Sequence, residues 1–167
     1  MPTTYGMPDS EVTATLKTAI AKWHQELEKH SVKIGVLMAS NENGPAVKHG
    51  GYAAAACVKA VPLKDRLTKH YDVEMLIDEA EWNSLTPAQR LALMDHELSH
   101  VLPTGKKDDL NRPKVKIVKA DWNVGDGFKD VVQRHGESAI EAWNIRRAYA
   151  AMEVAMKVQE IPFEEAA

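Results

Sequence analysis

The segment from Thr86 to His100 places the strongest constraint on what this chain can fold into. It contains the pattern H-E-x-x-H at residues 96–100, at the end of a stretch with the features of a capped helix. Thr86 is suited to the N-cap, Pro87 to the first helical position, and Gln89 to the return hydrogen bond of a capping box. Residues four apart lie on one helical face, so the imidazoles of His96 and His100 should point to one place. The segment therefore predicts a helix that presents two histidines side by side.

Two histidines with this spacing can bind one metal ion, and Glu97 is close enough to reach a water molecule on that ion. This is the sequence form of a zinc peptidase site, with two histidine ligands and a glutamate as general base. The alternative is a chance match, because 7 histidines in 167 residues produce the pattern occasionally. The helical context favours the metal site. The core stripe runs through Ala88, Leu91 and Met94, so the histidines on a second face are not needed as core residues.

Composition adds a few limits on function. The chain is 44% hydrophobic and 27% charged, as expected of one globular domain spanning residues 1–167. A net charge of −3 does not indicate nucleic-acid binding, although a local basic patch over residues 106–119 is compatible with it. The sequence shows no signal peptide and no membrane span, and its single cysteine excludes an intrachain disulfide. We therefore expect an intracellular protein with no membrane partner.

The remaining patterns predict an α+β fold. Helical spacing runs from residue 9 or 10 to about His30, and leaves His24 and His30 off the apolar stripe, exposed to solvent. Strands are expected at 32–39, 53–61, 73–78 and 115–119, a short helix at 128–135, and a long helix from 137 to about 159 with its apolar residues inside. Residues 102–105 should end the motif helix, and residues 106–113 should form a polar loop. Residues 1–8 and 162–167 are expected to be flexible tails.

A catalytic zinc ion usually takes three protein ligands and leaves a fourth position for water. The downstream candidates for the third ligand are Asp108, Asp109, Asp121, Asp126, His135 and Glu137. His135 is the first choice, because Phe128 and Val131 share its helical face and should carry it toward the core. A buried histidine that bonds a carbonyl or caps the helix end explains the same pattern equally well. Asp126 is the second choice, and a helix cap accounts for it equally.

A resemblance to a known family is carried by Val73–Asp78, Trp82, Leu85, Gln89 and Asp95–His100. This block resembles the phage-type metallopeptidases, small zincin-like domains that are distantly similar to the SprT-like proteases. Phe128, Val132 and Arg134–Gly136 resemble a downstream block of that family. The resemblance implies a compact zincin-like domain with a small mixed or antiparallel sheet, the HExxH helix and a long C-terminal helix.

The resemblance also implies zinc (Zn2+) on His96 and His100 and a catalytic Glu97. It implies a cytoplasmic location in a bacterial or phage-infected host cell. The third ligand does not carry over, because the family block often has a histidine or acidic residues where this chain has Asn123, Asp126 and Gly127. That difference leaves His135 as the leading candidate.

Two functional hypotheses follow from the sequence. The first is a zinc-dependent metallopeptidase that acts on a protein or peptide substrate, with Glu97 as general base. The second is a non-catalytic zincin-like binding module that contacts protein or DNA through the lysine-rich residues 106–119, with a structural metal or none. The substrate and the oligomeric state are not predicted by the sequence.

Overall fold

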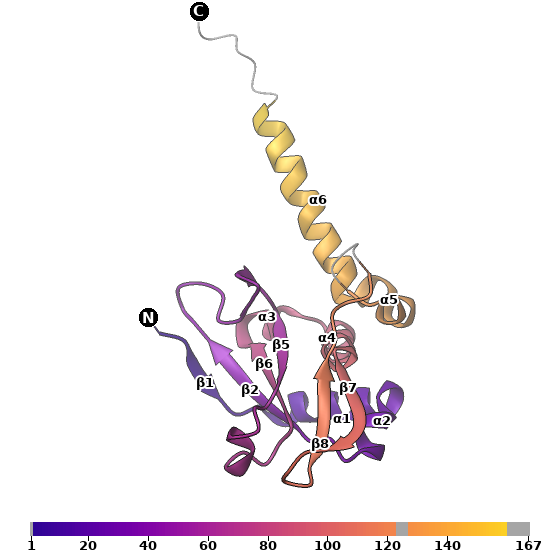
Figure 1. The fold of residues 1–167 in the computed structure, drawn as a ribbon. Coiled ribbons are helices and arrows are strands. Elements are labelled where there is room, and N and C mark those ends of the chain that lie inside the picture. The colour runs from indigo at the N-terminus through magenta and orange to yellow at the C-terminus, as the bar shows by residue number, and fades with distance from the viewer. Residues whose placement is uncertain (1, 123–126, 160–167) are drawn as a thin grey trace, which may run out of the picture.

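The computed structural model describes residues 2–122 and 127–159 (Figure 1). The strands are β1 (Thr4–Gly6), β2 (Ile34–Ser40), β3 (Lys48–His49), β4 (Tyr52–Ala53), β5 (Ala56–Ala60), β6 (Val73–Asp78), β7 (Val101–Lys107) and β8 (Pro113–Ile117). The helices are α1 (Ser10–Trp23), α2 (Gln25–Lys29), α3 (Glu79–Ser84), α4 (Pro87–Ser99), α5 (Lys129–His135) and α6 (Ile140–Gln159), with short 3-10 turns at Asp65–Leu67 and Gly136–Ser138. These elements confirm the predicted α+β class, the motif helix and the long C-terminal helix.

The main sheet is mixed, with the strand order β1-β2-β6-β5. β2 and β6 run parallel, while β1 and β5 are antiparallel to their neighbours. β6 has the bounds that its sequence predicts, and its alternate residues Val73, Met75 and Ile77 are fully buried. A strand period of two places these three side chains on one face, which is therefore the core face of the sheet.

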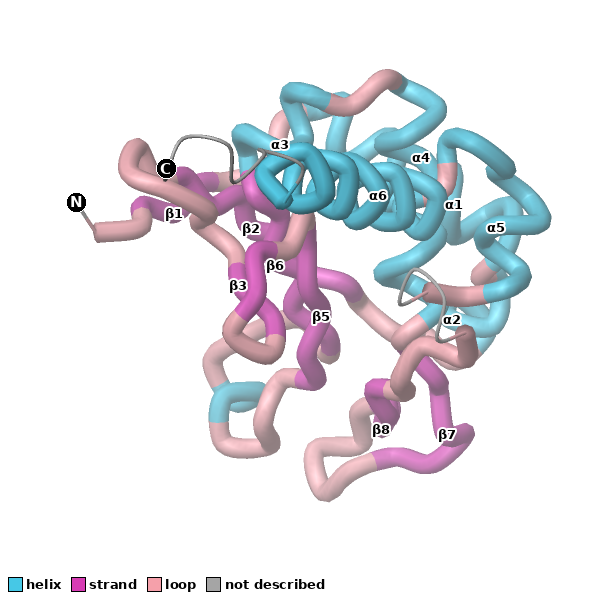
Figure 2. Tube along the Cα trace, turned by 90° about the horizontal axis from the view of Figure 1, so that it is seen from above, coloured by secondary structure: helices cyan, strands magenta, loops and turns pink. Residues whose placement is uncertain are grey.

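The helices gather on one side of this sheet (Figure 2). The main core cluster joins the buried face of the sheet to Val12, Leu16 and Ala19 of α1 and to Leu93, Met94 and Leu98 of α4. Asp9 starts α1 by accepting a hydrogen bond from the backbone N–H of Val12. α4 is thus held between α1 and the sheet, and this position fixes where its histidines lie.

Two sequence predictions about irregular segments need correction. Within the predicted flexible tail at residues 1–8, residues 4–6 form β1 and pair with residues 38–40 of β2. Residues 101–107, expected to end the motif helix and begin a loop, form β7, which pairs with β8. In both cases backbone hydrogen bonds to a partner strand decide the structure, and the side-chain pattern of a single segment does not reveal such a partner. The predicted tail at 162–167 lies outside the described residues.

The outer half of α6 also differs from expectation. The sequence predicts that Ala148, Ala151 or Met152, and Ala155 lie inside, yet all of them are exposed, and Met152 is 61% exposed. The helical period is correct, but α6 extends beyond the elements that could cover it (Figure 1). Among the described helices, none is long and apolar enough to cross a membrane.

Glu74 of β6 forms a charged cluster on the face of the sheet opposite the core. Its carboxylate accepts hydrogen bonds from Lys69 Nζ at 2.9 Å and Tyr71 Oη at 3.0 Å, and it pairs with Lys59 Nζ at 3.0 Å. Burial by itself would raise the pKa of Glu74, but these three donors outweigh it and lower the pKa from 4.5 to about 2. The folded state therefore favours the ionised carboxylate.

We expect Glu74 to contribute to the acid stability of the fold. A group whose pKa is depressed by folding stabilises the protein above its unfolded pKa, and this contribution is lost as pH falls through the folded pKa. Between pH 4.5 and pH 2 the free energy of unfolding of the wild type should therefore fall more steeply than that of Glu74→Gln. Denaturant titrations across this range measure the difference. The exposed Glu28→Gln is the matched control, and identical pH profiles for all three proteins would contradict the assignment.

Candidate metal and catalytic site

α4 begins as its sequence predicts, but it ends at Ser99, before the end expected at residues 102–105. Thr86 Oγ1 accepts from the Gln89 backbone and the Gln89 side chain accepts from the Thr86 backbone, which completes the capping box. The last two turns, Ala92–Leu98, are buried on every side. His96, at 8% exposed, and Glu97, at 5% exposed, thus lie inside the protein although both are polar. Buried polar groups need partners, so the partners of these side chains define the site.

His96 is oriented by Glu141 at the start of α6. His96 Nδ1 lies 2.8 Å from Glu141 Oε1, and the backbone N–H of Phe128 donates to the same oxygen at 3.0 Å. Glu141 is fully buried. Burial alone would raise its pKa, but these hydrogen bonds outweigh burial and lower the pKa below its ordinary value. An ionised carboxylate only accepts, so His96 Nδ1 carries the proton and Nε2 presents its lone pair.

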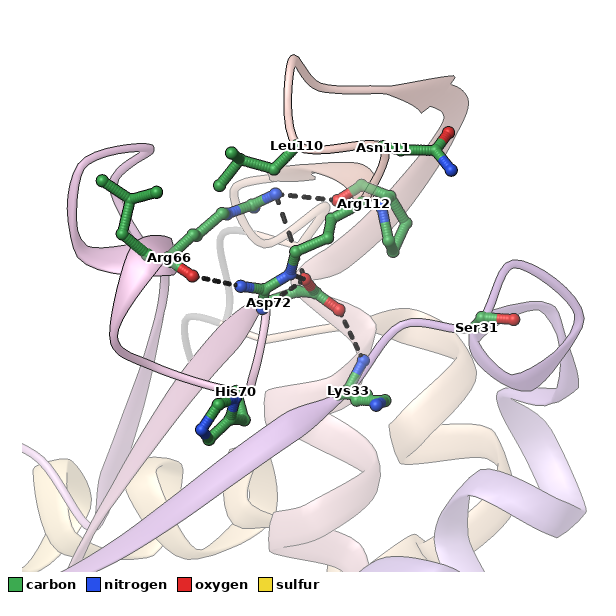
Figure 3. Close-up of a pocket in the computed structure, with 10 residues that line it drawn as sticks. Ser31, Lys33, Arg66, His70, Asp72, Leu110, Asn111 and Arg112 are labelled. Carbon is green, nitrogen blue, oxygen red and sulfur yellow. Dashed lines mark hydrogen bonds and ion pairs between the residues drawn. The ribbon is translucent and has the colours of Figure 1, made fainter.

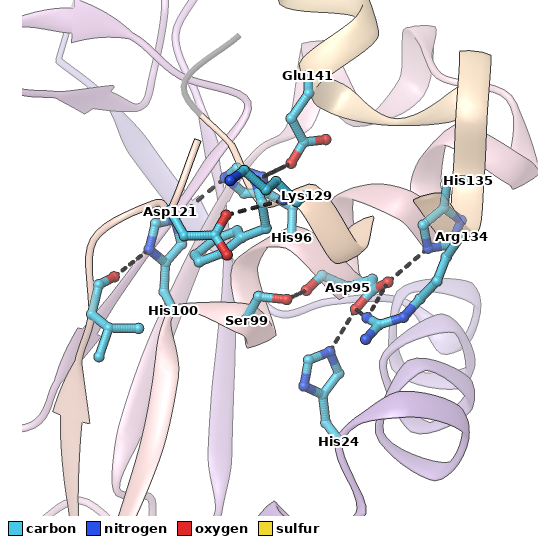
Figure 4. A network of polar contacts seen from close by, with 12 residues as sticks. His24, Asp95, His96, Ser99, His100, Asp121, Lys129, Arg134, His135 and Glu141 are labelled. Atoms are coloured by element: carbon cyan, nitrogen blue, oxygen red, sulfur yellow. Dashed lines mark hydrogen bonds and ion pairs between the residues drawn. The ribbon is translucent and has the colours of Figure 1, made fainter. Parts of the chain in front are cut away.

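His100 is oriented in the same manner by a backbone carbonyl. Its Nδ1 lies 2.7 Å from the carbonyl oxygen of Val118, the residue that follows β8. A carbonyl only accepts, so Nδ1 donates and Nε2 is left unprotonated in the neutral ring. The Nε2 atoms of His96 and His100 face each other at 3.3 Å (Figure 4). The ring of Phe128 packs edge-on against both imidazoles. The structure therefore brings the two predicted histidines together with their lone pairs converging.

Glu97 follows His96 in α4 and is buried. Burial raises the pKa of its carboxyl to about 7; the His96 ring opposes the rise when it is protonated, and the negative charge of Glu141 adds to it. A carboxyl group with a pKa near neutrality can both accept and release a proton under physiological conditions. Such a shift at a buried acid next to two histidines is typical of a functional site.

Glu141 is the site residue that the sequence analysis missed. An acidic residue in the first turn of a helix is ordinarily explained by the helix dipole, so the sequence did not single it out. The glycine at position 127 is the one sequence feature that pointed to a close contact here. A Cβ atom at residue 127 would lie 1.8 Å from Glu141 Cγ, so only glycine fits there. Gly127 also pairs with Trp122 through two backbone hydrogen bonds, which brings this backbone against the buried carboxylate.

His135 lies in a different cluster from the one predicted. Its Nε2 is 2.8 Å from Oδ2 of Asp95, which also pairs with Arg134 Nη1 at 2.9 Å and with His24 Nε2 at 2.6 Å. Asp95 is fully buried. Burial alone would raise its pKa, and the hydrogen bonds from its three partners outweigh burial and lower the pKa. His24, expected to be exposed, has only 12% of its side chain accessible because it belongs to this cluster.

The structure therefore does not bring His135 to His96 and His100 (Figure 4). His135 is directed inward, as its helical face predicts, but its partner is Asp95. It is a buried, hydrogen-bonded histidine as in the alternative, with a carboxylate in place of the expected carbonyl or helix end. The second candidate, Asp126, lies outside the described residues. Within residues 2–122 and 127–159, no three His, Cys, Asp or Glu side chains are grouped to hold a metal ion.

Two further third-ligand candidates have structural partners. Asp121 Oδ1 accepts from the backbone N–H of Lys129 at 3.0 Å, at the start of α5. Asp108 Oδ2 accepts from Arg66 Nη1 at 2.7 Å. Arg66 lines a pocket of about 510 Å³ between the segment before β6 and the β7–β8 turn (Figure 3). In this pocket Arg112 donates a hydrogen bond to Asp72. The charged residues of the pocket therefore connect the β7–β8 hairpin to the rest of the protein.

Comparison with known proteins identifies the family of this chain. Searches of curated proteins and of solved structures found no match. A family model described as "Putative phage metallopeptidase" matches residues 4–153, which include the sheet, the motif helix and Glu141. The name of the family implies a metal-dependent hydrolase. Because the match covers most of the 167 residues, the chain belongs to the putative phage metallopeptidase family.

Proposed function

We propose that this chain is a zinc-dependent metallopeptidase that hydrolyses peptide bonds in a protein or peptide substrate. His96 and His100 hold the zinc ion through their Nε2 atoms, and Glu97 is the general base. The observation that carries the proposal is the pair of Nε2 atoms 3.3 Å apart, with each Nδ1 hydrogen bonded to an acceptor. The motif helix against a mixed sheet also supports a zincin-like arrangement.

The spacing of the two Nε2 atoms fits zinc. Two imidazole nitrogens on one tetrahedral zinc ion, each at about 2.0–2.1 Å, are separated by roughly 3.4 Å, close to the 3.3 Å observed. Two neutral imidazoles with converging lone pairs repel each other, and a cation between them removes that repulsion. Glu141 and the Val118 carbonyl hold the Nδ1 atoms as the outer partners of metal-binding histidines usually do. The proposal leaves His135 with Asp95 rather than on the metal.

In this proposal the zinc ion and the side chains have separate roles in catalysis. Zinc, when bound, lowers the pKa of water and polarises the substrate carbonyl. Glu97 accepts the proton of the attacking water and returns it to the leaving amine. Burial, which raises the pKa of this carboxyl, favours its holding the proton between the two steps. Glu141 stays ionised and keeps the Nε2 lone pair of His96 available.

We expect Glu141→Ala to weaken metal binding, because His96 loses the acceptor that fixes its ring and its tautomer. Losing such a partner typically costs about 10- to 100-fold in metal affinity. Chelator competition with zinc on the folded protein measures the change. Glu141→Gln keeps an acceptor oxygen and should retain more affinity. His135→Ala is the matched control and should bind zinc stoichiometrically. Unchanged affinity in Glu141→Ala, or loss of zinc in folded His135→Ala, would contradict the assignment.

Glu97→Gln should abolish hydrolysis while zinc binding is retained. The amide cannot accept the proton of the attacking water, and loss of a general base lowers rates by about 100- to 10,000-fold. The measurement is cleavage of fluorescently labelled casein, with zinc content determined by mass spectrometry on the same samples. The exposed Glu11→Gln serves as the control. Equal activity in Glu97→Gln and wild type, or a wild type without stoichiometric zinc, would refute the proposal.

A groove of basic residues supports a second candidate function, contact with DNA. It lies between the end of α2 and the β7–β8 hairpin and is lined by His30, Lys29, Lys106, Lys107 and Lys114 among other residues. Cations grouped in this way can bind a phosphate backbone although the whole chain is acidic. Contact with DNA would serve a binding module, and it is also compatible with peptidase activity.

If the basic groove binds DNA, Lys106→Glu should weaken the binding of a labelled duplex by about three- to ten-fold at low salt and flatten the salt dependence. Fluorescence anisotropy over a salt series measures both effects. Lys17→Glu, the same charge change on exposed α1, should leave binding unaltered. A wild type without salt-dependent binding, or an equal loss in both variants, would exclude this function.

A further inference from the structure

The outer part of α6 extends away from the rest of the protein. The first turns of the helix are anchored: Glu141 is buried, Trp143 packs against the core, and Arg147 stacks 3.6 Å above the Trp143 ring. From residue 145 to residue 157 every side chain is exposed. Figure 1 shows this part of α6 pointing away from the sheet and the other helices. A long exposed helix needs a polar surface or a covering partner to be stable in water.

One face of this exposed part is apolar. Ile145, Tyr149, Met152 and Met156 recur at spacings of four, three and four, and are 39%, 64%, 61% and 59% exposed. This spacing places them in a single stripe along the helix, with Ala148 and Ala155 along one border. Large apolar side chains aligned in this way are typical of a surface that packs against another helix.

The charges along the stripe indicate what covers it. Arg146 and Glu153 lie one heptad apart along the border opposite the alanines. When two such helices pair in antiparallel orientation, equivalent borders meet, and Arg146 of one copy lies near Glu153 of the other. Two opposite-charge contacts then form by symmetry, one on each side of the two-fold axis. In parallel orientation each charged border meets an alanine border, and no such contact forms.

We infer that α6 is a dimerisation helix, and that a second copy of this chain covers the apolar stripe with its own α6 in antiparallel orientation. Tyr149 packs against Met152 of the other copy, and Ile145 against its Met156. The alanines at 148 and 155 let the two helix backbones approach closely on the uncharged side. This inference goes beyond the proposed hydrolytic function and does not depend on it.

The size of the contact sets the expected affinity. The stripe from Ile145 to Met156 is about 17 Å long at 1.5 Å per residue. A contact of this length buries less than the roughly 800 Å² per partner of a standard interface. The dimer should therefore dissociate in the micromolar range, and it must be studied across protein concentrations from about 1 to about 300 µM.

The first experiment is sedimentation equilibrium of the whole chain over that range, with metal present. The wild type should show a reversible monomer–dimer equilibrium. Met152→Glu, in the middle of the stripe, should raise the dimer dissociation constant by at least about ten-fold, since it buries an unpaired charge. Val154→Glu is the matched control, because Val154 is 63% exposed on the opposite side of α6, and it should leave the dissociation constant unchanged.

The second experiment tests orientation by charge reversal. Arg146→Glu and Glu153→Arg should each weaken the dimer, and the double variant should restore it, because the two symmetric contacts re-form with reversed signs. Circular dichroism confirms that each variant keeps its fold. A wild type that stays monomeric at the highest concentration overturns the inference. Binding of the α6 stripe to lipid vesicles, without dimerisation, also overturns it. Failure of the double variant to recover overturns the antiparallel arrangement.

Discussion

The buried hydrogen bond between His96 Nδ1 and Glu141 Oε1 is the contact on which the site depends. It joins the motif helix to the first turn of α6, 45 residues further along the chain, and it fixes which nitrogen of His96 faces His100. The carboxylate can occupy this place only because Gly127 has no side chain and because the Phe128 backbone donates a second hydrogen bond. Three segments must therefore be in place before His96 is correctly oriented. Such support is what distinguishes a site from a sequence pattern.

α4 carries a second buried contact on another of its faces. Asp95 directly precedes His96, so the helical twist directs its side chain elsewhere, toward α1 and α5. There it holds His24, Arg134 and His135. A buried carboxylate with several donors is costly to disrupt, by about 3–5 kcal/mol when one partner of such a pair is removed. The two clusters together prevent α4 from rotating or sliding, which holds the two Nε2 atoms at their separation.

The main elements of the fold could be read from the sequence where local rules apply. The capping box of α4 and the bounds of β6 depend on residues within the element itself, so the pattern was sufficient. The β7–β8 hairpin and β1 depend on a partner strand, and the exposure of α6 depends on where the domain ends. The partners of His24 and His135 also could not be predicted from the local sequence pattern. The helical face of His135 correctly predicted burial, but whether its partner was a metal ion or a carboxylate depended on Asp95, a residue 40 positions away.

The sequence by itself determined that His96, Glu97 and His100 lie on one capped helix, because helical geometry relates residues that are close along the chain. Helical geometry also relates the residues of the apolar stripe of α6, although the sequence analysis did not single out Ile145, Tyr149 and Met156. Only the tertiary structure decided that Glu141 and the Val118 carbonyl orient the two imidazoles, that His135 lies with Asp95, and that the stripe of α6 is left uncovered. Those outcomes depend on contacts between distant segments, and the packing of the whole chain selects them from among many compatible partners.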